Sequence, residues 1–68
     1  MNTRTVQISI IIPHYNGSKI IIECLSSLKM SKYRNYEILI VDNGSTDDSI
    51  ELINKDFSEV NVIKSDIN

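Results

Sequence analysis

The chain has 68 residues, of which 41% are hydrophobic, and a formal net charge of −2. A chain near this length buries only about 60% of the surface that it exposes when unfolded, so it forms one small domain or part of a larger one. The hydrophobic content excludes a disordered chain, and the lack of a basic block argues against nucleic acid as a partner. No apolar run approaches the ~20 residues of a membrane span, and the polar segment Met1–Gln7 lacks the pattern of a signal peptide.

Cysteine usage bears on the cellular setting. Cys24 is the single cysteine, so an internal disulfide is impossible and a cytoplasmic location is expected. Cys24 could act as a nucleophile or be a small apolar side chain buried on a helix. We favour the buried helix position because His14, the single histidine, has no acidic residue beside it in the sequence.

The first predicted element is a β-strand at Val6–Ile12. This run is rich in β-branched residues and is apolar on both faces from Ile10 to Ile12, as expected of a parallel strand inside a sheet. Pro13 is predicted to end the strand, because proline has no backbone N–H to donate to a neighbouring strand.

A helix is predicted next, from a cap at Ser18 or Asn16 to about Met30. Lys29 and Lys32 lie near its C-terminal end, where the helix dipole favours cations. Its buried face is predicted from apolar side chains that recur at helical spacing, namely Ile21, Cys24, Leu25 and Leu28.

The second half of the chain repeats this alternation. Tyr36–Val41 is predicted to be a nearly all-apolar strand, and Val60–Lys64 a third, shorter strand. A helix between them is predicted to begin with a cap at Ser45 or Thr46, with Asp48 completing a capping box. The buried side of this helix is predicted to carry Ile50, Ile53 and Phe57.

The order of these elements predicts an α/β fold. Because crossovers between parallel strands are right-handed, we expect a three-stranded parallel sheet in the order 3-2-1 with two crossover helices. This arrangement is half of a doubly wound fold, with strand 1 at one edge. The unpaired edge of strand 1 invites pairing with another copy, so a homo-oligomer is expected.

The segment Ile38–Ser49 carries the strongest functional signal. An apolar strand stops at Asp42, the turn residues Asn43 and Gly44 follow, and then a helix starts. Open α/β sheets bind ligands at the carboxyl ends of their strands, which is where Asp42 is predicted to lie. Its carboxylate could accept hydrogen bonds from a ligand, hold a metal or serve only the turn, and the residue pattern leaves these roles open.

A second strand-end loop, Pro13–Gly17, is predicted to lie beside the first. Tyr15 offers an aromatic face on which a nucleobase can stack. His14 either hydrogen-bonds a phosphate or faces water, and we favour the second. Asp47 and Asp48 are assigned to helix capping. The chain has no G-x-G-x-x-G fingerprint, no Walker A loop and no D-x-D triplet.

Three motifs occur in order along the chain. Val6–Asn16 ends in Pro-His-Tyr-Asn, Cys24–Leu28 reads Cys-Leu-Ser-Ser-Leu, and Tyr36–Ser49 contains Val-Asp-Asn-Gly-Ser-Thr-Asp-Asp. Their order and spacing resemble the start of a family 2 glycosyltransferase of the A-type nucleotide-sugar-binding fold. The resemblance covers nearly the whole chain and implies half of a Rossmann-like nucleotide-diphospho-sugar transferase fold.

The resemblance also implies an activity and a set of binding residues. The complete protein would transfer a sugar from a nucleotide-diphosphate donor to an acceptor hydroxyl, with inversion. Tyr15 and the first loop would hold the nucleoside, and Asp42 would hydrogen-bond its base. The donor-binding residues implied are Pro13, His14, Tyr15, Asn16, Asp42, Asn43 and Gly44. The tail Ser65–Asn68 resembles the approach to an Asn-x-Gly-Phe-like segment of rhamnosyltransferase-like members, with Asn68 as that asparagine.

Other parts of the family's machinery are expected outside this chain. The family's D-x-D motif binds Mg²⁺ or Mn²⁺ and the diphosphate, and a later Asp or Glu is the catalytic base. We therefore expect residues 1–68 to be the N-terminal, nucleoside-binding part of an incomplete catalytic domain, inactive alone and without a metal. The full-length protein could be membrane-associated through later segments.

Two other functions compete with this one. A non-catalytic binding or assembly module could use the same half-fold and associate through the edge of strand 1. A receiver-like domain would use Asp42 as a phosphoryl acceptor. We rank it lower because such sites need acids on neighbouring strand ends, and the first strand ends in Pro13, His14 and Tyr15.

Overall fold

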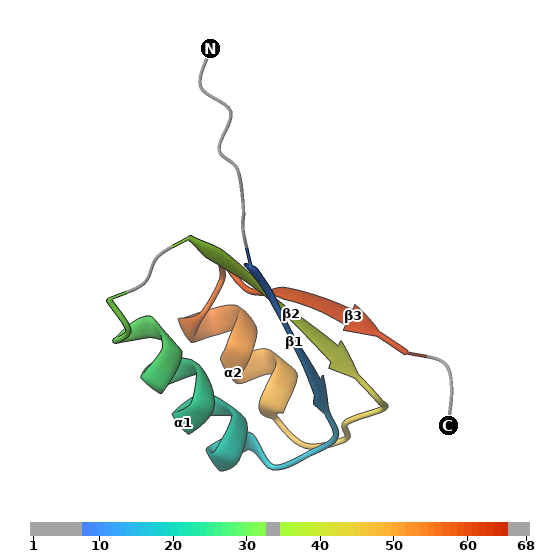
Figure 1. Ribbon diagram of the computed structural model, residues 1–68. Coiled ribbons are helices and arrows are strands. Elements are labelled where there is room, and N and C mark those ends of the chain that lie inside the picture. Colours follow the sequence, from blue (N-terminus) through green and yellow to red (C-terminus); the bar gives the residue numbers. More distant parts are fainter. Residues whose placement is uncertain (1–7, 33–34, 66–68) are drawn as a thin grey trace.

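The computed structural model describes residues 8–32 and 35–65 and shows an α/β fold in which strands and helices alternate (Figure 1). The elements in chain order are β1 (Ile8–His14), α1 (Ser18–Lys29), β2 (Tyr36–Asp42), α2 (Ser49–Asp56) and β3 (Asn61–Lys64). All three strands are parallel, and their order β1-β2-β3 confirms the predicted topology.

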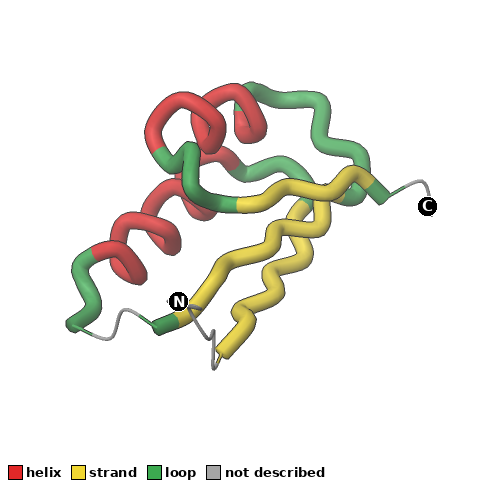
Figure 2. The backbone as a smooth tube through the Cα atoms, turned by 90° about the horizontal axis from the view of Figure 1, so that it is seen from above, coloured by secondary structure: helices red, strands yellow, loops and turns green. Residues whose placement is uncertain are grey.

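Both helices cover the same face of the sheet (Figure 2). Each crossover moves one strand further in the same direction, and right-handed connections then place both helices on one side. The apolar core fills the space between the helices and the sheet and consists of Ile21, Leu25, Ile40, Ile53, Phe57 and Val60. The predicted inner side of α2 is confirmed, since Ile53 and Phe57 are buried and Ile50 packs against them.

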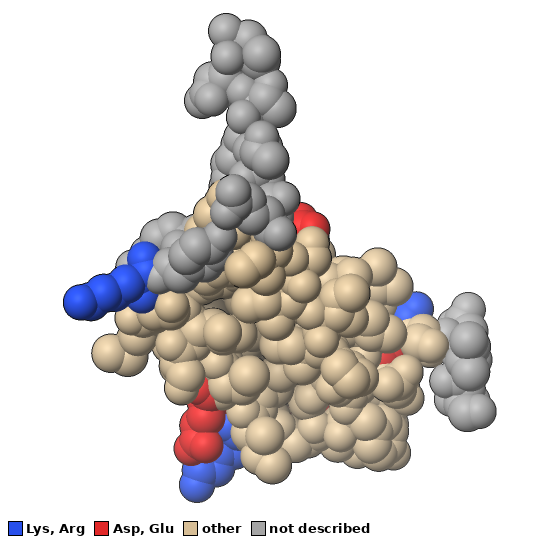
Figure 3. Space-filling model, viewed as in Figure 1, with Lys and Arg blue, Asp and Glu red and all other residues tan. Residues whose placement is uncertain are grey.

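The opposite face of the sheet has no helix over it. Two rows of side chains cross this face, Ile11–Leu39–Asn61 and Pro13–Val41–Ile63. Ile11 is 61% exposed and Ile63 is 53% exposed. In the view of Figure 3, charged side chains occur mainly around the margin of the molecule. This helix-free face is therefore apolar along most of these two rows, whereas Ser9 and Glu37, two positions before Ile11 and Leu39, form an exposed polar pair on the same face.

The prediction that Pro13 ends the first strand is wrong. The strand continues to His14, with Pro13 paired to Val41 and His14 to Asp42. The N–H of Asn43 donates to the His14 carbonyl at 2.8 Å, so the backbone polar groups of His14 face β2. Because these groups alternate in direction along a strand, the nitrogen of Pro13 faces the open edge, where its missing hydrogen costs no bond in the sheet.

The predicted helix caps are also wrong. α1 begins after Gly17 and α2 begins after Asp48, and neither N-cap residue makes a side-chain capping hydrogen bond. The side chains of Asn16 and Ser45, expected to cap the helices, instead hydrogen-bond between and within the loops. Local capping rules could not anticipate these longer-range partners.

Cys24 is exposed, which corrects the prediction that it is buried. Ile21 and Leu25 form the buried line of α1, and Leu28 packs beside them. Cys24 lies one position before Leu25, about 100° away around the helix, and falls outside that stripe.

Among residues 8–32 and 35–65, no helix combines the length and hydrophobicity needed to cross a membrane.

Candidate functional site

Two buried polar residues lie side by side at the carboxyl ends of β1 and β2. His14 pairs with Asp42 across the strands, and they are 8% and 2% exposed. Asp42 is two positions after the core residue Ile40, so its side chain points to the helix-bearing face. The predicted position of Asp42, at the end of a buried strand, is confirmed.

The carboxylate of Asp42 closes its own turn. It accepts the N–H of Ser45 at 3.3 Å on Oδ1 and 3.2 Å on Oδ2, and Oδ1 also accepts the Ser45 hydroxyl. Gly44 in this turn has a φ of 98° and open space where a Cβ would lie, so backbone conformation rather than space favours glycine there. An ionised carboxylate has about four lone-pair sites, so Oδ2 retains acceptor capacity.

The loop after β1 is bonded to the loop after β2. The N–H of Asn16 donates to Ser45 Oγ at 2.8 Å. In return, Asn16 Oδ1 accepts the N–H of Thr46 at 2.8 Å and of Asp47 at 3.3 Å. Asn16 adopts a φ of 53°, a left-handed conformation that asparagine tolerates better than most residues. The two loops thus form one bonded unit, and Asn16 is central to it.

Asp47, in the second loop, makes a further connection to the first loop. Its Oδ2 accepts the N–H of Gly17 at 2.8 Å, and its Oδ1 accepts the N–H of Ser49 at 3.0 Å as well as the Ser49 hydroxyl. The Ser49 hydroxyl, followed by the Ser49 amide and the Gly17 amide, lowers the pKa of Asp47 below its usual value, against a smaller opposing effect of burial. Asp47 is therefore held as an anion between the starts of α1 and α2.

Tyr15 and His14, two further predicted site residues at the end of β1, differ in their surroundings. Tyr15 is 62% exposed, so its ring is available to stack on a ligand. His14 does not face water, contrary to prediction, because its side chain is buried. Its Nε2 is buried and has no hydrogen-bond partner. A buried polar atom that stays unpaired costs about 1–3 kcal/mol, so a partner for Nε2 would be favourable here.

The described residues do not fit a metal centre. No three side chains of His, Cys, Asp or Glu come together within residues 8–32 and 35–65. We therefore derive no chemical step through a metal held by these residues.

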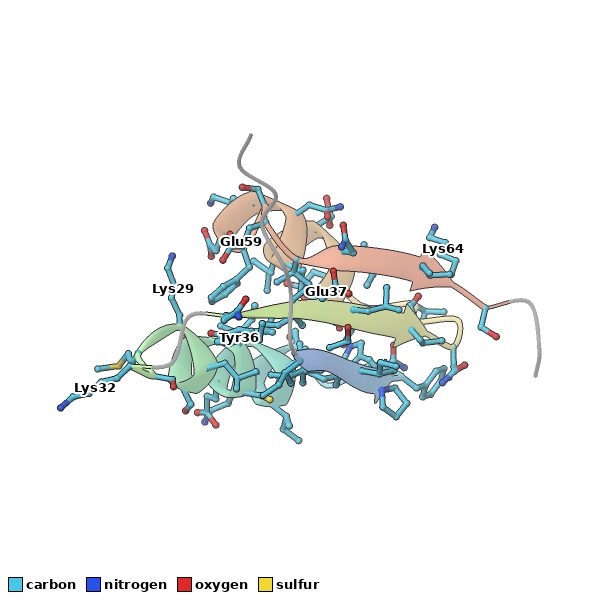
Figure 4. All side chains as sticks on the ribbon, turned by 45° about the horizontal axis from the view of Figure 1, so that its top comes forward. Lys29, Lys32, Tyr36, Glu37, Glu59 and Lys64 are labelled. Carbon is cyan, nitrogen blue, oxygen red and sulfur yellow. The ribbon has the colours of Figure 1, made fainter. Side chains whose placement is uncertain are left out.

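A separate cavity of about 250 Å³ lies at the other end of the sheet. Its lining consists of Leu25, Lys29, Tyr36, Ile38, Phe57, Glu59 and Val60. Figure 4 shows Lys29, Tyr36 and Glu59 near the start of β2, away from the strand arrowheads. Lys29 Nζ lies 5.5 Å from the centre of the Phe57 ring, a cation–π contact. The cavity is therefore distinct from the loop site.

Reasoning from sequence missed the roles of Ser45 and Asp47 in the site. Both were assigned to the start of the second helix, where small polar residues and acids are common. Their partners Asn16 and Gly17 lie about 30 residues earlier, and only the pairing of β1 with β2 brings them close. The sole sequence signal was the prediction that both loops leave the same edge of the sheet.

Comparison with known proteins defines the family. The family model described as glycosyl transferase family 2 matches residues 9–68, which is nearly the whole chain. The chain belongs to glycosyl transferase family 2. The matched segment includes both strand-end loops and all five described elements apart from the first residue of β1.

Similar proteins carry glycosyltransferase names. The chain is 44% identical over 45 residues to glycosyltransferase GlyG of Streptococcus pneumoniae serotype 4, covering 66% of this chain and 15% of that protein. It is 41% identical over 68 residues to poly(ribitol-phosphate) beta-glucosyltransferase of Bacillus spizizenii, covering 93% of this chain and 11% of that protein. It is 36% identical over 55 residues to chondroitin synthase of Escherichia coli, covering 81% and 8%. The chain thus spans less than a fifth of the length of each of these relatives.

Proposed function

We propose that this chain is the N-terminal, nucleoside-binding part of a family 2 glycosyltransferase. The complete enzyme would transfer a sugar from a nucleotide-diphospho-sugar to an acceptor hydroxyl, with inversion, and would work in the cytoplasm. The observation that supports this most is the joining of the two loops at the carboxyl ends of β1 and β2, because open α/β sheets bind ligands there.

The proposed roles follow from exposure and free hydrogen-bonding capacity. The exposed ring of Tyr15 would stack on the base, and Asp42 Oδ2 would accept one of its N–H groups. The remaining donor contacts implied by the resemblance would come from Pro13, His14, the backbone of Asn16, Asn43 and Gly44.

We propose that residues 1–68 are inactive alone. Inverting displacement needs a base for the acceptor hydroxyl and, in this family, Mg²⁺ or Mn²⁺ at the diphosphate, and we assign both to other parts of the complete enzyme. We propose further that the complete enzyme is rhamnosyltransferase-like. This proposal rests on the tail that ends at Asn68, and residues 66–68 lie outside the described residues.

A nucleotide titration tests the proposed site. We would add uridine diphosphate to ¹⁵N-labelled protein and follow the backbone amides by NMR. We expect shifts clustered at Tyr15, Asp42 and their neighbours, and weaker binding in Tyr15→Ala, because the stacking surface is lost. The matched control is Ile20→Ala, which also truncates a side chain that is 74% exposed but lies on α1. Shifts that cluster elsewhere, such as at the Lys29 cavity, would overturn the assignment.

A second candidate function is a non-catalytic assembly module that forms a homo-oligomer. The observation in its favour is the unpaired edge of β1, which in the described part of the chain pairs only with β2. This function predicts self-association without nucleotide binding, so the same titration separates it from the first.

A further inference from the structure

Four backbone amides of the candidate site donate to side chains of the opposite loop. Those of Asn16 and Gly17 donate to Ser45 Oγ and Asp47 Oδ2, and those of Thr46 and Asp47 donate to Asn16 Oδ1. Their partners are 29–31 residues apart in the sequence. We call the side chains of Asn16, Ser45 and Asp47 the inter-loop clasp.

Asp47 differs from the other members of the clasp because its carboxylate accepts hydrogen bonds from the starts of both helices. One carboxylate oxygen accepts the amide of Gly17, the N-cap residue of α1, and the other accepts the amide and hydroxyl of Ser49, the first residue of α2. Ser49 is fully buried, so this end of the clasp is fixed in the core. Asp47 thereby ties the start of α1 to the start of α2.

Gly17 is suited to this contact by its backbone. Its φ of 83° lies in the left-handed region, and the nearest atom to an added Cβ would be 3.9 Å away. Conformation rather than crowding therefore requires glycine there. In that conformation its N–H points to Asp47, while its carbonyl accepts the N–H of Ile21 at 3.1 Å.

We propose that Asp47 is a positioning residue of the donor site, which holds the loop bearing Tyr15 against the loop bearing Asp42 without touching the donor. The side chain of Asn16 is assigned the same positioning role, because its Oδ1 already accepts two amides. The proposal rests on the proposed function, since it states how the two nucleoside-binding loops are kept in register. Loops that are already fixed in their bound conformation bind a ligand more tightly, because less conformational entropy is lost on binding.

The test compares Asp47→Asn with Asp48→Asn. Both remove one negative charge at neighbouring positions, but the side chain of Asp48 makes no capping hydrogen bond. Asn16→Gly removes the other arm of the clasp and tolerates the positive φ at that position. For each variant we would measure the urea midpoint, the amide shifts of Gly17 and Thr46, and the dissociation constant for uridine diphosphate.

We expect Asp47→Asn to shift the Gly17 amide and to weaken binding of uridine diphosphate about tenfold in protein that remains folded, a change worth about 1.4 kcal/mol. Asp48→Asn should stay within about twofold of the wild type, and Asn16→Gly should shift Thr46 and weaken binding. A positioning role also predicts that the Gly17 amide of the wild type shifts in acid and that Asp47→Asn removes this shift. The other titratable groups of the loops and first helical turns are His14, Tyr15, Lys19, Asp42, Asp48 and Glu51.

The outcomes separate this proposal from the proposed function. If Asp47→Asn leaves the Gly17 amide and the affinity unchanged, or if Asp48→Asn weakens binding equally, the clasp is wrong even though the nucleotide site stands. If uridine diphosphate does not bind the wild type at all, the proposed function fails and the positioning role, defined by that function, is overturned with it. Loss of affinity that merely follows loss of folded protein in the urea experiment would also overturn it.

Discussion

At the end of β2, the carboxylate of Asp42 helps to connect the two loops of the candidate site. Asp42 is 2% exposed, and its carboxylate accepts hydrogen bonds from the amide and hydroxyl of Ser45. Ser45 Oγ in turn accepts the Asn16 amide, so a chain of hydrogen bonds runs from the first loop into the turn after β2. Such connected bonds are worth more than isolated ones in a poorly solvated setting.

Asp47 should make the fold sensitive to acid. Its pKa is lowered in the folded state by the hydroxyl and amide of Ser49 and the amide of Gly17. The stabilisation of the folded state by ionised Asp47 is therefore complete above the usual pKa of an unfolded aspartate. It is lost as the pH falls through the lower pKa that Asp47 has in the folded state. We expect urea midpoints measured across this acidic range to fall less steeply for Asp47→Asn than for the wild type. Asp48→Asn is the control, and an equal change in its slope would contradict the prediction.

At the scale of the element, α2 is short and depends on its buried side. It spans eight residues, too few for an isolated helix to be stable in water. Ile53 is fully buried between the sheet and α1, and Phe57 closes the core just beyond the last turn. The helix is therefore held by packing, and it in turn holds Ser49 and the clasp in place.

Truncating Ile53 should unfold much of the protein. We expect Ile53→Ala to lower the free energy of unfolding by about 2–5 kcal/mol, because it leaves a cavity in the core. The matched control is Ile20→Ala, since Ile20 is 74% exposed and its loss should change stability by less than about 0.5 kcal/mol. Urea denaturation followed by circular dichroism measures both. Equal effects of the two substitutions would show that the core is not where the structure places it.

At the scale of the whole molecule, the topology leaves one face and one edge of the sheet uncovered. Both crossovers run in the same direction, so both helices lie on one face, and the apolar rows through Ile11 and Val41 have no helix over them. Parallel sheets normally have both faces covered. In the described residues, β1 also has a free edge, which Pro13 blunts at one position.

The oligomer proposed above should form through the edge of β1. The backbone N–H of Ile11 faces this edge, by the same alternation that turns the nitrogen of Pro13 outward. Ile11→Pro should therefore shift the protein toward monomer in analytical ultracentrifugation while leaving the pairing with β2 intact. Ile11→Ala keeps the N–H and truncates only the side chain on the open face, so it should still associate. Dissociation by both variants would assign the contact to the face, and a wild-type monomer at high concentration would remove the oligomer altogether.

Much of the fold could be predicted from local pattern. The apolar runs that became β1 and β2 and the helical spacing of Ile21 and Leu25 follow from the periodicity of side chains in strands and helices. Because crossovers between parallel strands are right-handed, the strand order 3-2-1 could then be predicted. Element boundaries were less certain. Pro13 remained in its strand because its nitrogen faces the edge, which depends on which neighbour β1 has.

The candidate site was predicted only in part, and the division has a physical cause. The sequence by itself determined that Asp42 ends a buried strand and that Tyr15 follows a neighbouring one, because these placements depend on periodicity and strand direction. Only the tertiary structure decided that Asn16 and Asp47 bond across the loops, that His14 is buried and that Cys24 is exposed. The bonds across the loops depend on which segments about 30 residues apart meet in the register of β1 and β2, and no local preference encodes that meeting.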